Sequence, residues 1–359
     1  MHTQAKDSPT QSLQAESPKR NYPFNCWWVA AAADEVTREP LCRWLLDQRV
    51  VLYRTENGAV AALEDRCAHR WAPLSGGQLV GDDIACPYHG FRYNARGICT
   101  FVPTQSHVPA ALKVKSYPVR EYAGFIWLWT GDVAKADPGL LPEIAWAADP
   151  AYFVTLRRYN GELRCNYMLL QENLMDLTHI PYLHAGAYAE YGGWHKAPEV
   201  KITDRSVTYV QRDSGVPFPC TLVHIEAGKR VNRIDRGTFA SPACTLIGSE
   251  YEDPAPADGQ RGRYNAQVLH CVTPISPGRC HYWNVFAFDF GQEIFKSHEA
   301  PAAEWDAIVK QDRTAVEAIQ TTIDEDVNGD RVPKVLVRAD AAAVEAQRIV
   351  QKMLQAESG

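Results

Sequence analysis

The hydrophobic pattern of the first third of the chain predicts short strands joined by tight turns. Two β-branched and apolar runs meet at Asn57-Gly58, a dipeptide typical of hairpin turns. Turn residues also separate the apolar runs that follow. The predicted strands and hairpins are 50–55, 59–64, 84–86, 91–93, 98–101 and 117–129. We therefore expect residues 21–135 to form an all-β domain.

The rest of the chain combines strand patterns with helical periodicity, which predicts a second, α+β domain at residues 136–359. The proline-containing stretch 131–150 is typical of a connector. We expect helices from Asn166, around Trp305, and from Asp340, whose carboxylate is the expected N-cap. The expected strands are 200–203, 207–211, 264–272 and 281–290. These strands indicate an antiparallel sheet on which the helices pack.

Composition narrows the class of protein. A chain of 359 residues can hold two domains with real cores, and a net charge of -6 argues against nucleic-acid binding. No apolar run approaches the ~18 residues of a membrane span. The polar segment 1–20, which we expect to be a disordered tail, lacks the apolar core of a signal peptide. We therefore predict a cytoplasmic protein whose scattered cysteines are mostly reduced thiols.

Two cysteines belong to a pattern that indicates a metal cluster. Cys67 and His69 form a Cys-x-His pair, and Cys86 and His89 form a Cys-x-x-His pair on a second short loop. Zinc takes the same ligand types at similar spacings. However, each loop offers one sulfur and one nitrogen, which favours a [2Fe-2S] cluster with two thiolates on one iron and two imidazoles on the other. The chain is therefore expected to handle electrons.

A second histidine pair lies about a hundred residues later. On an unbroken helix, His179 and His184 would point about 140° apart, too divergent for one metal. Pro181 cannot continue the helical hydrogen bonds, so we expect the helix to kink or end near His179 and to bring His184 back toward the same point. Asp176, one helical turn before His179, is expected to support that histidine from below.

Two histidines leave a mononuclear metal short of one ligand, and a carboxylate would complete a 2-His-1-carboxylate triad. An inward-facing acid in an amphipathic helix is therefore informative. Asp312 falls inside such an apolar stripe, whereas Asp306 and Glu317 fall on the polar side. The stripe consists of Trp305, Ile308, Val309, Ala315, Val316 and Ile319. We expect Asp312 to be the third ligand.

With both motifs in this order, the chain resembles the Rieske non-haem iron oxygenases, in particular the terminal oxygenase subunits of the vanillate and dicamba O-demethylase type. The resemblance extends from about Tyr22 to the C-terminus and implies an all-β Rieske [2Fe-2S] domain followed by a helix-grip catalytic domain. It implies that Asp176 links the iron site to a cluster histidine of a neighbouring chain, either His89 or His69. Asn173 is then expected beside the mononuclear Fe(II), and the Asp-x-x-x-Val-Glu pattern of the family matches 312–317.

The resemblance also implies what the enzyme uses. We expect O2 as co-substrate, a small aromatic substrate such as a methoxybenzoate, and a homo-oligomer that is most simply a trimer. Neither a Gly-x-Gly-x-x-Gly motif nor a plant-type cysteine run occurs, so NAD(P)H is expected to act only through a separate ferredoxin-reductase protein.

Several alternatives stay open from the sequence. The reaction could instead be ring or side-chain hydroxylation, or N-demethylation, of another aromatic or polycyclic substrate. A pure electron-transfer protein would use only the cluster and would leave the histidine pair and Asp312 unexplained. His270 and Asn284 lie on strands that line the substrate pocket in this family, but each could equally be a structural polar residue.

Overall fold

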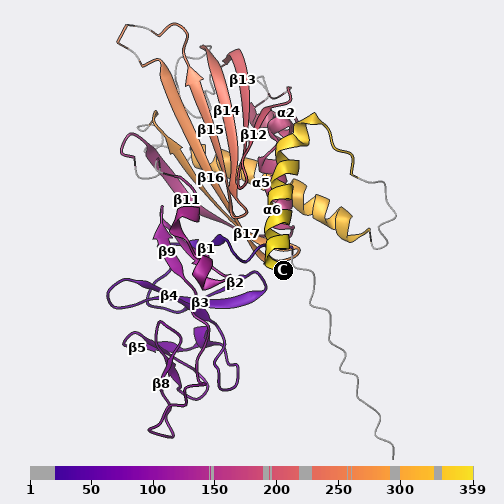
Figure 1. The fold of residues 1–359 in the computed structure, drawn as a ribbon. Helices are drawn as coiled ribbons and strands as arrows, with labels where there is room; N and C mark the ends of the chain where they lie inside the picture. The colour runs from indigo at the N-terminus through magenta and orange to yellow at the C-terminus, as the bar shows by residue number, and fades with distance from the viewer. Residues whose placement is uncertain are drawn as a thin grey trace, which may run out of the picture.

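The computed structural model describes residues 21–144, 146, 149–188, 194, 196–217, 229–256, 258–259, 261–291, 300–326 and 334–358. The tail expected at 1–20 lies outside these residues. Figure 1 shows a region of short strands, in indigo to magenta, at one end of the molecule and a large sheet with helices beside it at the other. This is the expected α+β class with an all-β N-terminal part.

The N-terminal part consists of three small antiparallel sheets, with strand orders β1-β10-β9, β2-β3-β4 and β5-β6-β7-β8. The predicted hairpins are present: β3 pairs with β4 across Asn57-Gly58, and β9 pairs with β10 across Ala123-Gly124. Both glycines have positive φ angles, which glycine tolerates at no steric cost. The strands are β1 (Trp27–Ala32), β2 (Leu41–Leu45), β3 (Gln48–Arg54), β4 (Val60–Glu64), β5 (Gln78–Val80), β6 (Asp83–Ala85), β7 (Arg92–Tyr93), β8 (Cys99–Phe101), β9 (Val119–Tyr122) and β10 (Phe125–Trp129).

The second part contains a seven-stranded antiparallel sheet with the order β11-β17-β16-β15-β14-β13-β12. Consecutive strands from β12 to β17 are therefore neighbours, and β11 closes the far edge beside β17. The strands are β11 (Phe153–Leu163), β12 (Glu199–Ile202), β13 (Val207–Pro217), β14 (Arg230–Ser241), β15 (Cys244–Glu252), β16 (Arg263–Ser276) and β17 (Arg279–Phe288). The sequence patterns identified β12, β13, β16 and β17 but did not single out β11, β14 or β15.

The helices lie beside this sheet. α1 contacts α5, α6, β15 and β16, and α6 also contacts β12 and β13. The α-helices are α1 (Tyr167–Leu174), α2 (Ile180–Leu183), α3 (Ala185–Tyr188), α5 (Ala300–Asp324) and α6 (Ala341–Ser358), and the short 3-10 turns include η1 (Leu74–Gly76), η2 (Val133–Lys135), η3 (Pro138–Leu140), η5 (Leu177–His179) and η7 (Arg338–Asp340). None of the described helices combines the length and the apolar character that a membrane crossing requires.

Two helix predictions need correction. Asp340 is not the N-cap of the last helix, because a 3-10 turn from Arg338 precedes α6, and the Asp340 carboxylate instead accepts a 2.6 Å hydrogen bond from the Val337 N–H. Ile319 does not belong to the buried stripe of α5, since 48% of it is exposed. The buried face of this part of α5 passes through Val316 and Gln320 instead, which are 1% and 8% exposed.

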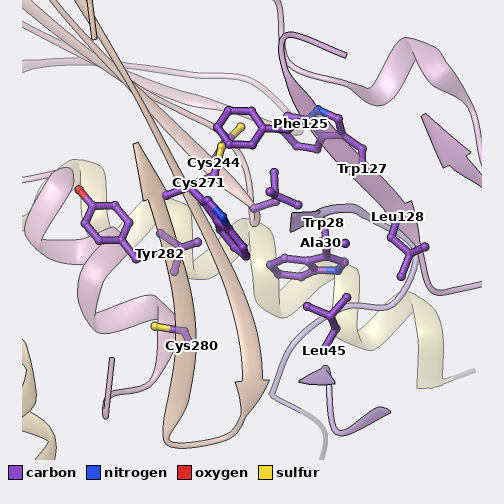
Figure 2. Close-up of a cluster of buried hydrophobic side chains, with 14 of the residues drawn as sticks. Trp28, Ala30, Leu45, Phe125, Trp127, Leu128, Cys244, Cys271, Cys280 and Tyr282 are labelled. Carbon is purple, nitrogen blue, oxygen red and sulfur yellow. The ribbon is translucent and has the colours of Figure 1, made fainter. Parts of the chain in front are cut away.

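The two parts share one hydrophobic core. Trp28 of β1 and Trp127 of β10 are fully buried in the same cluster as Cys244, Cys271 and Trp283 of the large sheet. Figure 2 shows Trp28 and Trp127 in the same cluster of side chains as Cys244 and Cys271. Backbone hydrogen bonds from Leu46 and Asp47 to carbonyls of β16 reinforce this contact. The domain boundary at residue 135 stays a prediction, but the shared core fixes the N-terminal part against the sheet.

Candidate metal centres and substrate cavity

The first candidate centre lies on two loops with the same backbone pattern. The Trp71 N–H donates to the Cys67 carbonyl at 2.9 Å, and the Gly90 N–H donates to the Cys86 carbonyl at 3.0 Å, so each loop closes over four residues. The closing residues both have left-handed backbone conformations, with φ values of 62° at Trp71 and 70° at Gly90. Such a φ is unusual for a tryptophan and costs conformational energy. Strained backbone of this kind is typical of functional sites.

The side chains on these loops separate into a buried sulfur side and an exposed nitrogen side. Cys67 and Cys86 are 2% and 3% exposed, whereas His69 and His89 face solvent with their ring centroids 4.7 Å apart. The Cys67 sulfur lies 3.2 Å from the Tyr93 hydroxyl, which can donate to a thiolate. Burial raises the pKa of the Cys86 thiol, so its thiolate needs a cation beside it. This donor set fits a cluster with two sulfur and two imidazole ligands.

The second candidate centre is built where α1 ends. Asn166 caps α1 by accepting a hydrogen bond from the Met168 N–H, and the helix stops at Leu174. Asp176 then has an extended conformation, with φ -134° and ψ 101°, and caps η5 by accepting from the Thr178 N–H. The prediction that the break would come near His179 because of Pro181 was wrong in position. Pro181 lies in the first turn of α2, where its missing N–H costs nothing.

This break brings the three predicted residues of the triad together. His179, His184 and Asp312 offer ligand atoms that all lie within 4.8 Å of one another. The Oδ1 atom of Asp312 lies 3.1 Å from Nε2 of His184 and 3.5 Å from Nε2 of His179. Asp312 comes from α5, so the site joins two segments distant in sequence. Two imidazoles and one carboxylate form the donor set of a 2-His-1-carboxylate iron site, and this arrangement could hold a mononuclear metal ion.

Hydrogen bonds at the outer nitrogens orient both rings. His179 Nδ1 lies 2.6 Å from the main-chain carbonyl of Asp176, and His184 Nδ1 lies 2.8 Å from the Oε1 atom of Gln311. Both partners are acceptors, so both Nδ1 atoms carry the proton and both Nε2 lone pairs face Asp312. The expectation that the Asp176 carboxylate supports His179 from below was wrong, because its main-chain carbonyl does so while its Oδ1 atom accepts from the Thr178 hydroxyl at 2.7 Å.

The site also perturbs the two imidazoles differently. Burial lowers the pKa of His179, and the nearby Asp312 only partly offsets this. For His184, burial also lowers the pKa, but hydrogen bonds to Asp312 and Gln311 outweigh it and the net shift is upward. Asn173, expected beside the metal, donates to the Asp312 Oδ1 atom at 3.3 Å. Asn173 therefore holds the carboxylate that faces both histidines.

A cavity of about 140 Å³ opens at this site. Engineered apolar cavities of similar size bind benzene, so one aromatic ring fits. Apolar side chains of the sheet and of α5 make up most of its wall, including Ile247, Val268, Phe286, Phe288, Trp305 and Ile308. His270 also lines the cavity, and its Nδ1 atom lies 2.7 Å from the Tyr282 hydroxyl. Burial lowers the pKa of His270 to about 4, so this imidazole is neutral at neutral pH.

Asn284 behaves differently from His270. It lies directly opposite His270 across β16 and β17 and is 0% exposed, but it is not among the residues that line the cavity. Its two amide atoms are both buried without a hydrogen-bond partner within the described residues.

Sequence reasoning missed the polar end of the cavity, which contains Trp194, Arg233, Asp235 and Ser249. A signal was present, because Arg233 and Asp235 are charged residues at alternate positions between the apolar Val231 and Phe239. This spacing places charges on the buried face of a strand, where they need partners. The strand itself was not predicted, so the signal was not read.

Comparisons with known proteins agree with this geometry. Residues 26–118 match the family model of the Rieske [2Fe-2S] domain, and residues 163–356 match that of the vanillate O-demethylase oxygenase C-terminal domain. The oxygenase component of dicamba O-demethylase from Stenotrophomonas maltophilia is 34% identical, with 93% of this chain and 98% of that protein covered. A vanillate O-demethylase oxygenase subunit from a Pseudomonas species is 30% identical, with 94% and 96% covered.

A solved structure extends the likeness to the fold. Dicamba monooxygenase with non-haem iron and dicamba matches this chain with a TM-score of 0.79 at 33% identity, covering 93% of this chain and 98% of the other. The curated relatives are named as components or subunits of larger oxygenase systems. An electron donor in such a system is therefore a separate protein.

Proposed function

Because this chain belongs to the Rieske non-haem iron oxygenases with a vanillate O-demethylase-type C-terminal domain, we propose that it removes the methyl group from an aromatic methyl ether. The chain is an oxygenase component, an oxidoreductase with a [2Fe-2S] cluster and a mononuclear iron site. The observation that carries the proposal is the convergence of His179, His184 and Asp312 on an apolar cavity sized for one ring. A role in electron transfer alone would leave this second site without a purpose.

In this proposal, Cys67, His69, Cys86 and His89 hold the cluster, and the triad holds the iron. When bound, these two groups supply electrons and activate O2, so that one oxygen atom enters a C–H bond of the substrate methyl group and the other leaves as water. The hydroxylated methyl group is a hemiacetal, which breaks to formaldehyde and a phenol. Two electrons and two protons balance the reaction, and the electrons come from the separate donor protein.

The residues of the chain prepare the site for this chemistry. Gln311 and the Asp176 carbonyl keep the two rings in one orientation, and Asn173 holds Asp312. The apolar wall excludes water from the reacting methyl group, which limits side reactions. Neutral His270 meets the Tyr282 hydroxyl at Nδ1, so its Nε2 atom can carry the proton and donate to an oxygen of the substrate.

We further propose that Asp176 joins the two centres across a subunit interface of a homo-oligomer, most simply a trimer. Figure 1 supports a route between chains, because β5 and β8 of the cluster part lie at the opposite end of the molecule from α2. The main-chain carbonyl of Asp176 contacts the iron-site residue His179, which keeps the Asp176 carboxylate close to the iron site. In the oligomer this carboxylate would contact a cluster histidine of the neighbouring chain, His89 or His69.

Product analysis tests the function. The holoenzyme, with both metal centres and an electron donor, should consume O2 and release formaldehyde and the matching phenol from methoxylated aromatic compounds in a one-to-one ratio. Omission of the electron donor is the control and should abolish both products. Hydroxylated products that keep the methoxy group, with no formaldehyde, would contradict demethylation.

A further inference from the structure

The cavity wall is ordered in rows across the sheet. Asp235 of β14 lies opposite Ser249 of β15, which lies opposite Ala266 of β16. The next row along the same face holds Ile247, Val268 and Phe286, and the row after it holds His270. His270 comes four positions after Ala266, so the polar row of Asp235 and Ser249 lies roughly 13 Å along the strand from the His270 row. An apolar row between them is left for a ring.

The guanidinium at the polar end is already occupied by carboxylates. The Nε atom of Arg233 lies 2.9 Å from the Oδ2 atom of Asp235, and its Nη2 atom lies 3.1 Å from the Oδ2 atom of Asp213. The three side chains are buried, at 3%, 3% and 8% exposure. The Trp194 ring covers the guanidinium at 3.9 Å. Counted formally, one guanidinium and two carboxylates give this buried group a charge of -1 within the described part of the chain.

Two of the polar groups that line the cavity at this end, Ser249 and Asp235, are acceptors. The Ser249 hydroxyl donates a 2.6 Å hydrogen bond to the Oδ1 atom of Asp235. Because its only proton is used in this bond, the Ser249 oxygen offers the cavity lone pairs only. Burial raises the pKa of Asp235, and the ion pair with Arg233 and the hydrogen bonds from Ser249 and the Trp194 Nε1–H offset this rise only in part. A substrate group placed here meets oxygen lone pairs and net negative charge. It must donate a hydrogen bond.

We propose that the cavity selects an aromatic ether whose ring bears a neutral hydrogen-bond donor, such as an amide N–H or a phenolic O–H, directed at Ser249 and Asp235. The same residues discriminate against a substrate with a carboxylate at that place. A carboxylate there would lose its water and meet the negative charges of Asp235 and Asp213. The described wall of the cavity contains no lysine and no arginine other than Arg233. The methoxybenzoate expected from sequence is thus the less favoured form.

This inference rests on the proposed function for the reacting group, but binding can test it separately. The probes are 3- and 4-methoxybenzamide and the corresponding methoxybenzoates, titrated by calorimetry into the anaerobic holoenzyme near neutral pH. We expect the better benzamide to bind at least about tenfold more tightly than its benzoate, as for a hydrogen bond to a charged acceptor. Equal or tighter binding of the benzoate would overturn the inference.

Two variants identify the residues responsible. Ser249→Ala removes one acceptor and should reduce the preference for the benzamide about tenfold, whereas Asp235→Asn adds an amide donor and should raise benzoate affinity about tenfold. Ser241→Ala is the matched control, because Ser241 lies on β14 outside the cavity. This variant should leave the ratio of benzamide affinity to benzoate affinity unchanged. If Asp235→Asn fails to fold, Ser249→Ala still decides. An unchanged ratio in Ser249→Ala would refute the assignment.

The two proposals fail in distinguishable ways. If none of the four compounds yields formaldehyde while the benzamides still bind more tightly, the reaction class is wrong and the selectivity stands. If formaldehyde forms faster from the benzoates, the reaction class stands and the selectivity is wrong.

Discussion

The Nδ1 atom of His184 lies 2.8 Å from the Oε1 atom of Gln311, while Nε2 of the same ring lies 3.1 Å from Asp312. Two consecutive residues of α5 therefore contact both nitrogens of one imidazole. A single helix thus supplies one candidate ligand and fixes the orientation of another. The geometry of the iron site depends on how α5 packs against α1 and the sheet.

We predict that Gln311→Leu weakens iron binding. Loss of the acceptor leaves His184 Nδ1–H without its partner, and loss of such orienting groups typically costs about 10–100-fold in metal affinity or activity. Iron content after dialysis against a graded series of chelator concentrations measures the effect, with the cluster absorbance as an internal reference. Gln311→Glu keeps an acceptor at the same place and should retain iron. A leucine variant that holds iron as firmly as the unmodified protein would contradict this role.

Replacement of Asp312 should separate the two centres. In Asp312→Ala we expect the cluster absorbance to persist and the mononuclear iron to be lost, because two imidazoles alone hold the ion weakly. The ratio of iron to acid-labile sulfide should fall from three irons per two sulfides toward two per two. Asp306→Ala, an exposed position on the same helix, is the control and should keep the full ratio. Full iron retention in Asp312→Ala would mean that another carboxylate is the ligand.

The candidate ligands were accessible from sequence because each has a local signal. Cys67 and His69, with their counterparts on the second loop, follow a fixed spacing. Asp312 is an acid in an apolar stripe, which is costly unless it is bound. Gln311 had no such signal, since it is a polar residue at an exposed position of α5. Its function depends on the ring that α2 brings beside it, and that contact joins residues 127 positions apart.

The strands, too, could be predicted only where the sequence carries a local signal. The β3–β4 hairpin follows from an Asn-Gly turn, whereas β14 carries the charged Arg233 and Asp235 on its buried face, where a strand pattern requires apolar residues. Arg233 is stabilised there by ion pairs with Asp213 of the neighbouring strand and Asp235 of its own strand. The strand pairing that creates these contacts is a tertiary property. The position of the helix break was likewise decided by the Asp176 cap and not by Pro181.

We predict that Asp176→Asn keeps both metal centres but slows transfer between them by about 10–100-fold. Asparagine can still accept from the Thr178 N–H and preserve the cap of η5, while the charge that would bridge the two centres is lost. Oxidation of the reduced cluster by O2 in a single turnover with substrate measures the step. Thr178→Val removes the hydroxyl bond to Asp176 but leaves the carboxylate, and should transfer electrons normally. Normal coupled turnover in Asp176→Asn would remove the proposed bridge.

The same proposal predicts an oligomer. Sedimentation at the concentration of the activity assay should show a closed homo-oligomer, most simply a trimer, because each iron site needs the cluster of a neighbour. Dilution to a monomer should abolish turnover while leaving both metal signals. A monomer with full activity is incompatible with transfer between chains.

Gly237 is predicted to be essential for packing on the inner face of the sheet. A Cβ atom at this position would lie 2.0 Å from Cε1 of Tyr209, a ring that is only 1% exposed. Gly237→Ala should therefore lower the free energy of unfolding by about 1–3 kcal/mol, as overpacking does in other cores. Gly278→Ala is the control, since its Cβ would meet no atom within 4 Å. In a Tyr209→Leu background the cost of Gly237→Ala should shrink, and chemical denaturation of all four variants measures this coupling.

His281 connects the two parts of the molecule in its neutral form. Its Nε2–H donates to the Trp44 carbonyl at 3.0 Å, and its Nδ1 atom accepts from the Tyr159 hydroxyl at 2.8 Å. Burial lowers the pKa of His281 to about 4, and the positive charges of Arg43 and Arg279 add to this lowering. The hydrogen bond to the Trp44 carbonyl and the negative charge of Glu162 raise the pKa, but by less. Between this value and the ordinary pKa of 6.5, the unfolded chain binds the proton and the folded chain does not.

Lowering the pH should therefore destabilise the folded protein. The stability that neutral His281 contributes is present in full above pH 6.5 and is lost as the pH falls toward 4, by about 3 kcal/mol over the window. Chemical denaturation at several pH values from 7 to 4.5 should therefore show a shallower slope for His281→Gln, which keeps a donor for Trp44 but does not titrate. His107→Gln, at an exposed position, should keep the slope of the unmodified protein. Parallel slopes for the unmodified protein and His281→Gln would show that the imidazole is protonated in the folded state.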